Sequence, residues 1–302
     1  MTAYRQGDTI LYYEARKVWT GDSREEVVYI TGAGPCEGQL VIPGDIDGYV
    51  VYGIGKKAFL GSHITAVVIP GSVREMEDWA FAQCAALKNV FFESETAECT
   101  LGKGVFDDCV RIQNIFLRGR GEKSLAALFA TLPVKLSGEH LMTAGDVGST
   151  EWFAKYDARL VAFLREDNHE GYTTLVLCGE EDIMRSPDGY VSDKIMRKAA
   201  LCFTRLMHDK YLDEETRKIY TDYILSYNKG CVTDEAWQAL LSEFGDDIEY
   251  FRLFTDMGGV TADNLDEILV DMEDKNAEAK AYLIKYRQSK LCVQDAFSMF
   301  QL

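Results

Sequence analysis

The side chains of this 302-residue chain that could do chemistry are its histidines, cysteines and paired acids. Metal and nucleophile sites need such residues at fixed spacings, because the side chains must converge on one atom. The histidines show neither His-Glu-x-x-His nor another ligand spacing, and acid pairs such as Glu180-Glu181 are typical of solvated surfaces. We therefore expect neither a metal site nor a catalytic site. The histidines are His63, His140, His169 and His208.

The eight cysteines are scattered and form no Cys-x-x-Cys pair. This pattern argues against a zinc ribbon, a redox dithiol or a dense disulfide framework, so most should be reduced thiols in the core. They are Cys36, Cys84, Cys99, Cys109, Cys178, Cys202, Cys231 and Cys292.

Two glycine-containing segments could cradle phosphate, but neither has the required spacing. GRGEKS (119–124) lacks the G-x-x-x-x-G-K spacing of a phosphate loop, and GIGKKAF (53–59) lacks a third glycine. DIDG, from Asp45, is too short for a calcium loop. We expect no cofactor, and an enzyme is not indicated.

The charge of the chain favours some partners over others. The net charge is -17; residues 1–121 hold 12 basic and 16 acidic residues, and residues 122–302 hold 20 and 33. Such a field repels phosphate, and the sequence shows no basic patch beyond short pairs such as Lys56-Lys57. We expect no nucleic-acid or membrane partner. A cationic protein partner fits better, although acidic helices also serve solubility alone.

Nothing in the sequence resembles a targeting or membrane-spanning segment. MTAYRQGDTILYYEARKV has no charged region followed by an apolar one, and no later stretch is apolar for about 18 residues. We expect a cytoplasmic protein, or a surface protein if a leader has been removed.

The most informative pattern is internal repetition. Three segments, ITAVVI, LKNVFF and IQNIFL, share an apolar-x-x-apolar-x-apolar pattern and start 23 and 25 residues apart, at Ile64, Leu87 and Ile112. A fourth, QLVIPG, fits 27 residues before the first and repeats VIPG. A second ladder includes Phe59, Phe81 and Phe106. Units this short bury their apolar faces only by stacking, which predicts a solenoid.

These runs resemble the treponemal, or BspA-like, leucine-rich repeat. LVIPGDIDGYVVYGIGKKAFLGS (40–62) and VVIPGSVREMEDWAFAQCAALKNVFF (67–92) show its I-P pair, its I-G-x-x-A-F segment and its cysteine-containing link to the next strand. Met76-Glu77 in place of I-G, Ser62 in place of Cys and Glu93 in place of Pro depart from the pattern. The resemblance implies a solenoid of a mostly bacterial, often surface-exposed family that binds proteins rather than catalysing.

Strand alternation predicts which side chains face outward. The inward set should be Leu40, Ile42, Val67, Ile69, Val90, Phe92, Ile115 and Leu117. The outward column should be Val41, Val68, Phe91 and Phe116, flanked by Thr65, Lys88 and Gln113 and by Ala66, Asn89 and Asn114. An apolar stripe at strand spacing of about 4.8 Å is rarely left in water. We expect a partner, the chain's own helices or a second copy to cover it.

The remaining chain divides by its hydrophobic period. TILYYEAR and EEVVYITG, parted by TGDS, predict a hairpin cap in residues 1–36, before repeats in 37–120. KSLAALFATL (123–132) begins helical spacing within a connecting segment, 121–150, which has a joint near Gly145. Residues 151–302 should form an acidic helical domain, giving an α+β protein overall.

Within that helical domain, Thr233 and Thr261 are expected N-caps, with Trp237 and Leu265 packing on the valine before each cap. The last helices resemble degenerate ankyrin-type or other α-solenoid repeats, and a plain helical bundle is the alternative.

Three functions remain open. The first is a non-catalytic protein-interaction module that uses the stripe, the helical domain or both. The second is a structural, self-assembling protein that uses the same surface. The third is an enzyme or inhibitor with its site in the helical domain.

Overall fold

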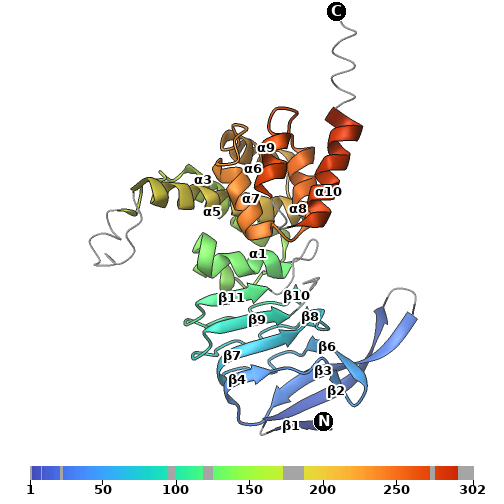
Figure 1. The fold of residues 1–302 in the computed structure, drawn as a ribbon. Helices are drawn as coiled ribbons and strands as arrows, with labels where there is room; N and C mark the ends of the chain where they lie inside the picture. Colours follow the sequence, from blue (N-terminus) through green and yellow to red (C-terminus); the bar gives the residue numbers. More distant parts are fainter. Residues whose placement is uncertain are drawn as a thin grey trace, which may run out of the picture. The chain divides into compact units, whose positions relative to one another are not determined.

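The computed structural model describes residues 2–7, 9–20, 23–93, 99–117, 125–172, 187–272 and 276–291 (Figure 1). The chain divides into two compact units. The first is Met1–Leu160 with His208–Tyr211, and the second is Val161–Met207 with Leu212–Leu302. A β-solenoid occupies the first unit and helices make up the second, so the expected α+β fold is confirmed.

An antiparallel meander opens the first unit. Its strands are β1 (Thr2–Gln6), β2 (Thr9–Thr20) and β3 (Ser23–Ala33). β2 pairs with β3 as the expected hairpin, and β1 adds a third strand that the sequence patterns did not indicate. Because β3 also pairs in parallel with a solenoid strand, the hairpin continues one of the solenoid's sheets.

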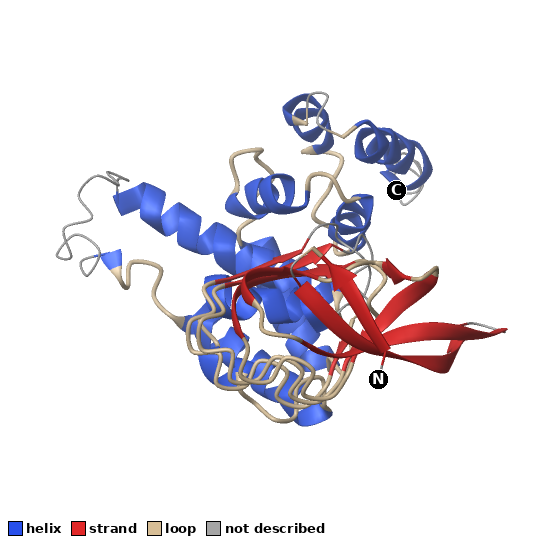
Figure 2. Ribbon diagram, turned by 90° about the horizontal axis from the view of Figure 1, so that it is seen from below, coloured by secondary structure: helices blue, strands red, loops and turns tan. Residues whose placement is uncertain are grey.

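The solenoid has two sheets joined by turns. One, here sheet A, runs β1-β2-β3-β6-β8-β10 with β5 paired to β6; the other, here sheet B, runs β11-β9-β7-β4. Viewed along the stack, the turns superpose (Figure 2). The strands are β4 (Glu37–Val41), β5 (Asp45–Ile46), β6 (Tyr49–Ile54), β7 (His63–Pro70), β8 (Glu75–Met76), β9 (Asn89–Glu93), β10 (Thr100–Leu101) and β11 (Asn114–Leu117).

Stacked phenylalanines form the core between the sheets. The ring centroids of Phe59 and Phe81 are 4.9 Å apart, and those of Phe81 and Phe106 are 5.6 Å apart. The Cys84 and Cys109 thiols donate to the carbonyls of Phe59 and Phe81, so they are buried thiols as expected. Of the predicted inward set, Leu117 is only half-buried, because it lies on the edge strand β11.

Helices follow β11 in the chain. They are α1 (Leu125–Thr131), the π-helical η1 (Leu132–Leu136), α2 (Glu139–Met142) and α3 (Thr150–Arg165). α1 packs on β11 and β10, and Phe129 stacks on Phe106 at 5.6 Å. The helix thus extends the phenylalanine ladder and covers its end (Figure 1).

The second unit is helical. Its helices are α5 (Pro187–Met207), α6 (Glu214–Ser226), α7 (Glu235–Phe244), α8 (Ile248–Asp256), α9 (Leu265–Asp271), α10 (Ala277–Tyr286) and the π-helical η2 (Arg287–Leu291). The pairs α7-α8 and α9-α10 each follow a glycine with positive φ, Gly230 and Gly258, 28 residues apart. Trp237 of α7 donates to Asp271 of α9 at 2.7 Å, joining the two pairs.

The predicted N-caps of these pairs were wrong. α7 begins after Asp234 and α9 after Asn264, rather than after Thr233 and Thr261. The Asp234 carboxylate accepts the N–H of Cys231, and the Asn264 side-chain oxygen accepts the N–H of Thr261. These side chains close the loop before each helix, so the helix begins later than a threonine cap would start it.

Two buried lysines cap the carboxyl end of α3 within the second unit. The Lys198 ammonium donates to the carbonyls of Leu164 and Glu166 and to the Asn168 side-chain oxygen, and Lys194 donates to the Asp167 carbonyl at 2.8 Å. Burial, followed by the charge of Lys194, lowers the pKa of Lys198. These bonds satisfy carbonyls that a helix end leaves without partners.

Candidate functional site

The four outward apolar residues predicted from the sequence form one row across sheet B. Val41 pairs with Val68, Val68 with Phe91, and Phe91 with Phe116. The strands are parallel and in register, so the row crosses all four of them. It lies on the face opposite the phenylalanine ladder, as side-chain alternation requires.

Exposure along the row is uneven. Val41 is 43% exposed and Phe116 46%, whereas Val68 is buried at 9% and Phe91 is half-buried. The rings of Phe91 and Phe116 stack with centroids 4.8 Å apart and planes 11° from parallel. Neighbouring side chains therefore cover the centre of the row, while both ends present apolar surface.

A row of amides runs beside the apolar row on the same face. Asn114 pairs with Asn89, and its side-chain N–H donates to the Asn89 side-chain oxygen at 3.0 Å. Asn89 pairs with Ala66, which pairs with Gln39. The sequence reading missed Gln39, although the 27-residue offset that relates Leu40 to Val67 also relates Gln39 to Ala66.

The two remaining predicted residues lie where the strands begin. Lys88 and Gln113 are exposed, and each precedes its strand. Their backbone N–H groups donate to the carbonyls of Thr65 and Lys88, one turn back in each case. The exposed Lys88 therefore gives the edge of sheet B where β9 begins a positive charge.

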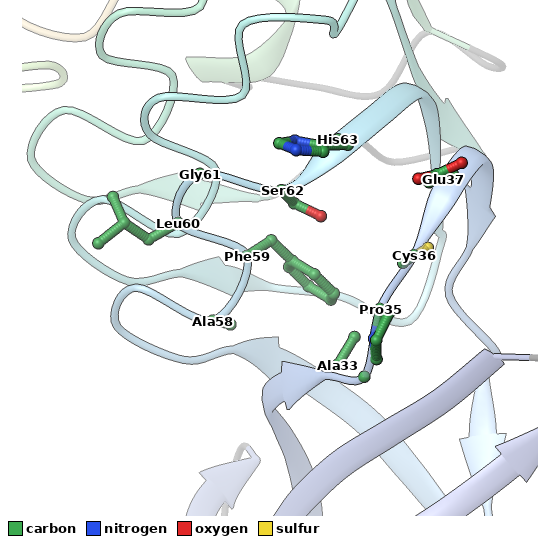
Figure 3. A pocket seen from close by; sticks show the side chains of 11 residues that line it. Ala33, Pro35, Cys36, Glu37, Ala58, Phe59, Leu60, Gly61, Ser62 and His63 are labelled. Atoms are coloured by element: carbon green, nitrogen blue, oxygen red, sulfur yellow. The ribbon is translucent and has the colours of Figure 1, made fainter.

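A hollow of about 310 Å³ lies beside the first turn of the solenoid (Figure 3). Cys36 and Glu37 lie on one side of it, across from Ser62 and His63 (Figure 3). A thiol and an imidazole could in principle perform nucleophilic chemistry, but the thiolate is the reactive form. Burial raises the pKa of Cys36, and the Thr9 hydrogen bond offsets this only in part. The thiol is therefore protonated near neutral pH, which disfavours catalysis here.

A second hollow, of about 390 Å³, opens along β8 and β10. It is lined by three acids, but each of these carboxylates already has a partner. Glu75 accepts the Tyr29 hydroxyl at 2.7 Å, and Glu77 accepts Arg16 and the N–H of Lys56. The third acid, Asp78, accepts the N–H of Lys103 at 2.9 Å. The acids thus join turns and strands of the first unit.

Neither a metal cluster nor a membrane span is found in the part of the chain that the structure describes. Over those residues, no three metal-ligating side chains gather at one place. No described helix is both long and apolar enough to cross a bilayer.

Comparison with known proteins agrees with this geometry. Residues 50–131 match the model of the BspA type leucine rich repeat region, six copies long. The solenoid is a BspA-type leucine-rich repeat region. A search of curated proteins found no match to the chain.

Solved structures that resemble the chain include bacterial leucine-rich repeat proteins. The Treponema pallidum (T. pallidum) leucine-rich repeat protein is 26% identical, with a TM-score of 0.29 over 36% of this chain and 49% of its own. A leucine-rich cell surface protein from Faecalibacterium prausnitzii is 23% identical, with a TM-score of 0.29 over 39% and 32%. The match to this chain covers less than half the length of each of these two proteins.

Proposed function

We propose that the protein is a non-catalytic interaction module that binds a protein partner on the outer face of sheet B. The observation that carries this proposal is the apolar row in register, which leaves Val41 and Phe116 nearly half exposed. Exposed aromatic side chains beside polar groups are typical of binding surfaces. Leucine-rich repeat proteins are generally protein-interaction or surface modules.

The face also suggests how a partner would bind. A segment lying across the strands would bury Phe116, Phe91 and Val41, and the stacked pair of rings is the natural anchor because aromatic groups dominate interface energies. The amides of Gln39, Asn89 and Asn114 would supply hydrogen bonds alongside.

Charge adds a second element to the proposal. The acidic surplus of residues 122–302 would attract a cationic region of the partner and speed its association. The positive Lys88 beside the row would instead meet a polar or acidic group. We therefore propose a partner with an apolar contact segment and a basic region elsewhere.

The test replaces the two stacked rings. Phe91→Ser with Phe116→Ser should weaken partner capture from native cell extract at least about 30-fold, because one central aromatic contact contributes about 2 kcal/mol. Tyr49→Ser with Val50→Ser is the matched control, since these residues of β6 are 45% and 47% exposed. Thermal unfolding checks that both variants fold.

Unchanged capture by the folded ring variant would reject the proposal. Light scattering of the same proteins separates the self-assembly alternative. If wild type is a dimer that only the ring variant dissociates, the row is a contact between copies rather than a partner site.

A further inference from the structure

Three lysines from two turns of the solenoid, the neighbours Lys56 and Lys57 and the distant Lys103, gather around Trp79. The ammonium groups of Lys56, Lys57 and Lys103 lie 5.2, 5.5 and 5.6 Å from the centroid of the Trp79 ring. Lys103 is 46 residues from Lys57 in sequence, so only the stacking of turns unites them. The fold therefore forms a basic patch that the sequence alone did not reveal.

The backbone fixes this arrangement. Lys57, Trp79 and Gly104 hold equivalent places in successive turns, with φ of 58°, 55° and 56°. The N–H of Lys57 donates to the carbonyl of Asp78, and that of Trp79 to the carbonyl of Lys103 at 2.8 Å. A Cβ at Gly104 would lie 3.0 Å from the indole, so the missing side chain leaves room for the ring. The Trp79 ring thus packs against the next turn at Gly104.

The charges of the patch are only partly balanced. Asp78 lies 3.7 Å from the Lys56 ammonium, whereas in the described ranges of the chain no carboxylate is paired with the ammonium of Lys57 or Lys103. The acids nearby, Glu75 and Glu77, are bound to Tyr29 and Arg16.

All three lysines are exposed, and the Trp79 ring is half-buried. In a chain of net charge -17, the fold has therefore concentrated unpaired positive charge on an aromatic surface. Like charges held this close repel one another, and an anionic group would relieve that repulsion.

We propose that this patch binds an acidic peptide segment of a partner protein, with carboxylates at Lys57 and Lys103 and an apolar side chain against Trp79. Charge complementarity supports the acids, and the half-buried ring supports the apolar contact. A nucleic acid is disfavoured, because a long polyanion would extend beyond three lysines onto an acidic surface. The site lies in the turns that follow β6, β8 and β10, whereas the apolar row lies on sheet B, so the two do not depend on each other.

Calorimetry at low salt with defined probes tests the proposal. The full chain should bind the capped peptide Glu-Glu-Phe-Glu-Glu more tightly than Glu-Glu-Gly-Glu-Glu, and should not bind Lys-Lys-Phe-Lys-Lys. Lys57→Gln with Lys103→Gln should weaken binding about fivefold, because two exposed pairs of about 0.5 kcal/mol each contribute about 1 kcal/mol together. Trp79→Gly, which suits the positive φ, should remove the preference for phenylalanine.

Two controls make the outcome specific. Lys17→Gln with Lys285→Gln removes the same charge from exposed positions elsewhere and should leave binding unchanged. Phe91→Ser with Phe116→Ser should also leave it unchanged, which separates this site from the proposed function. Three results would overturn the proposal. They are an absence of peptide binding, equal weakening by both lysine-pair variants, and tighter binding of a ten-nucleotide oligothymidylate than of the acidic peptide.

Discussion

At the scale of single residues, neighbouring side chains of one strand have opposite roles. Phe92 of β9 faces the core and is 2% exposed, while Phe91 faces outward and stacks on Phe116. The inward ladder contributes to stability, and the outward row is available for recognition. A phenylalanine's place in the two-residue period of the strand decides which role it has.

Replacing one phenylalanine of each kind should show this difference. Phe92 of β9 is 2% exposed on the inward face, so Phe92→Ala should lower the free energy of unfolding by about 4 kcal/mol. Phe116 is 46% exposed, and Phe116→Ala should cost about 1 kcal/mol. Urea unfolding of both variants measures these losses, and equal losses would contradict the assignment of the two faces.

Much of this residue pattern could be predicted from the sequence, because period and register are local properties. The offsets of 23 to 27 residues were enough to place Val41, Val68, Phe91 and Phe116 in one row. The lysines around Trp79 could not be predicted in the same way. Their convergence depends on where long flexible side chains end, and the repeat pattern does not specify this.

At the scale of elements, both ends of the solenoid are closed by structures that do not repeat its sequence. Phe129 continues the ladder from a helix, so its role does not appear in the strand pattern. At the other end the hairpin is joined to the second turn by Arg16 of β2 and Glu77, which follows β8. Arg16 also stacks on Tyr29 of β3 at 4.0 Å.

The link between hairpin and solenoid should depend on pH. Burial raises the pKa of Glu77. The hydrogen bonds from Arg16 and from the Lys56 N–H, together with the charge of Arg16, lower it by more, so the pKa is lowered overall. A carboxyl whose pKa is lower when folded stabilises the protein above its unfolded pKa, about 4.5, and loses that contribution as pH falls through the folded value.

Glu77→Gln tests this link. The two side chains are 34% and 25% exposed, so solvent screening limits the loss at pH 7 to about 1 kcal/mol. The difference from wild type should shrink as pH falls below about 4.5. Urea unfolding of both proteins at pH 7 and pH 3.5 measures it, and a difference that stays constant would count against the ion pair.

At the scale of the whole molecule, the chain combines a repeat solenoid with helical units of another period. Its charge is also divided, since residues 122–302 carry most of the acidic surplus while the Trp79 patch is basic. The sequence could predict the two fold types, because strand and helix periods differ. It could not predict the extent of the first compact unit, which reaches Leu160 within α3, because that depends on tertiary contacts.

The most direct test of the proposed binding face is photo-crosslinking in the native cell. A benzophenone amino acid at Phe116 should give a protein adduct, while the same group at Val50, with nearly equal exposure of 47%, should give none. An adduct formed through position 116, on β11, would place the partner on sheet B. Equal crosslinking from both positions, or adducts at Val50 alone, would contradict the account.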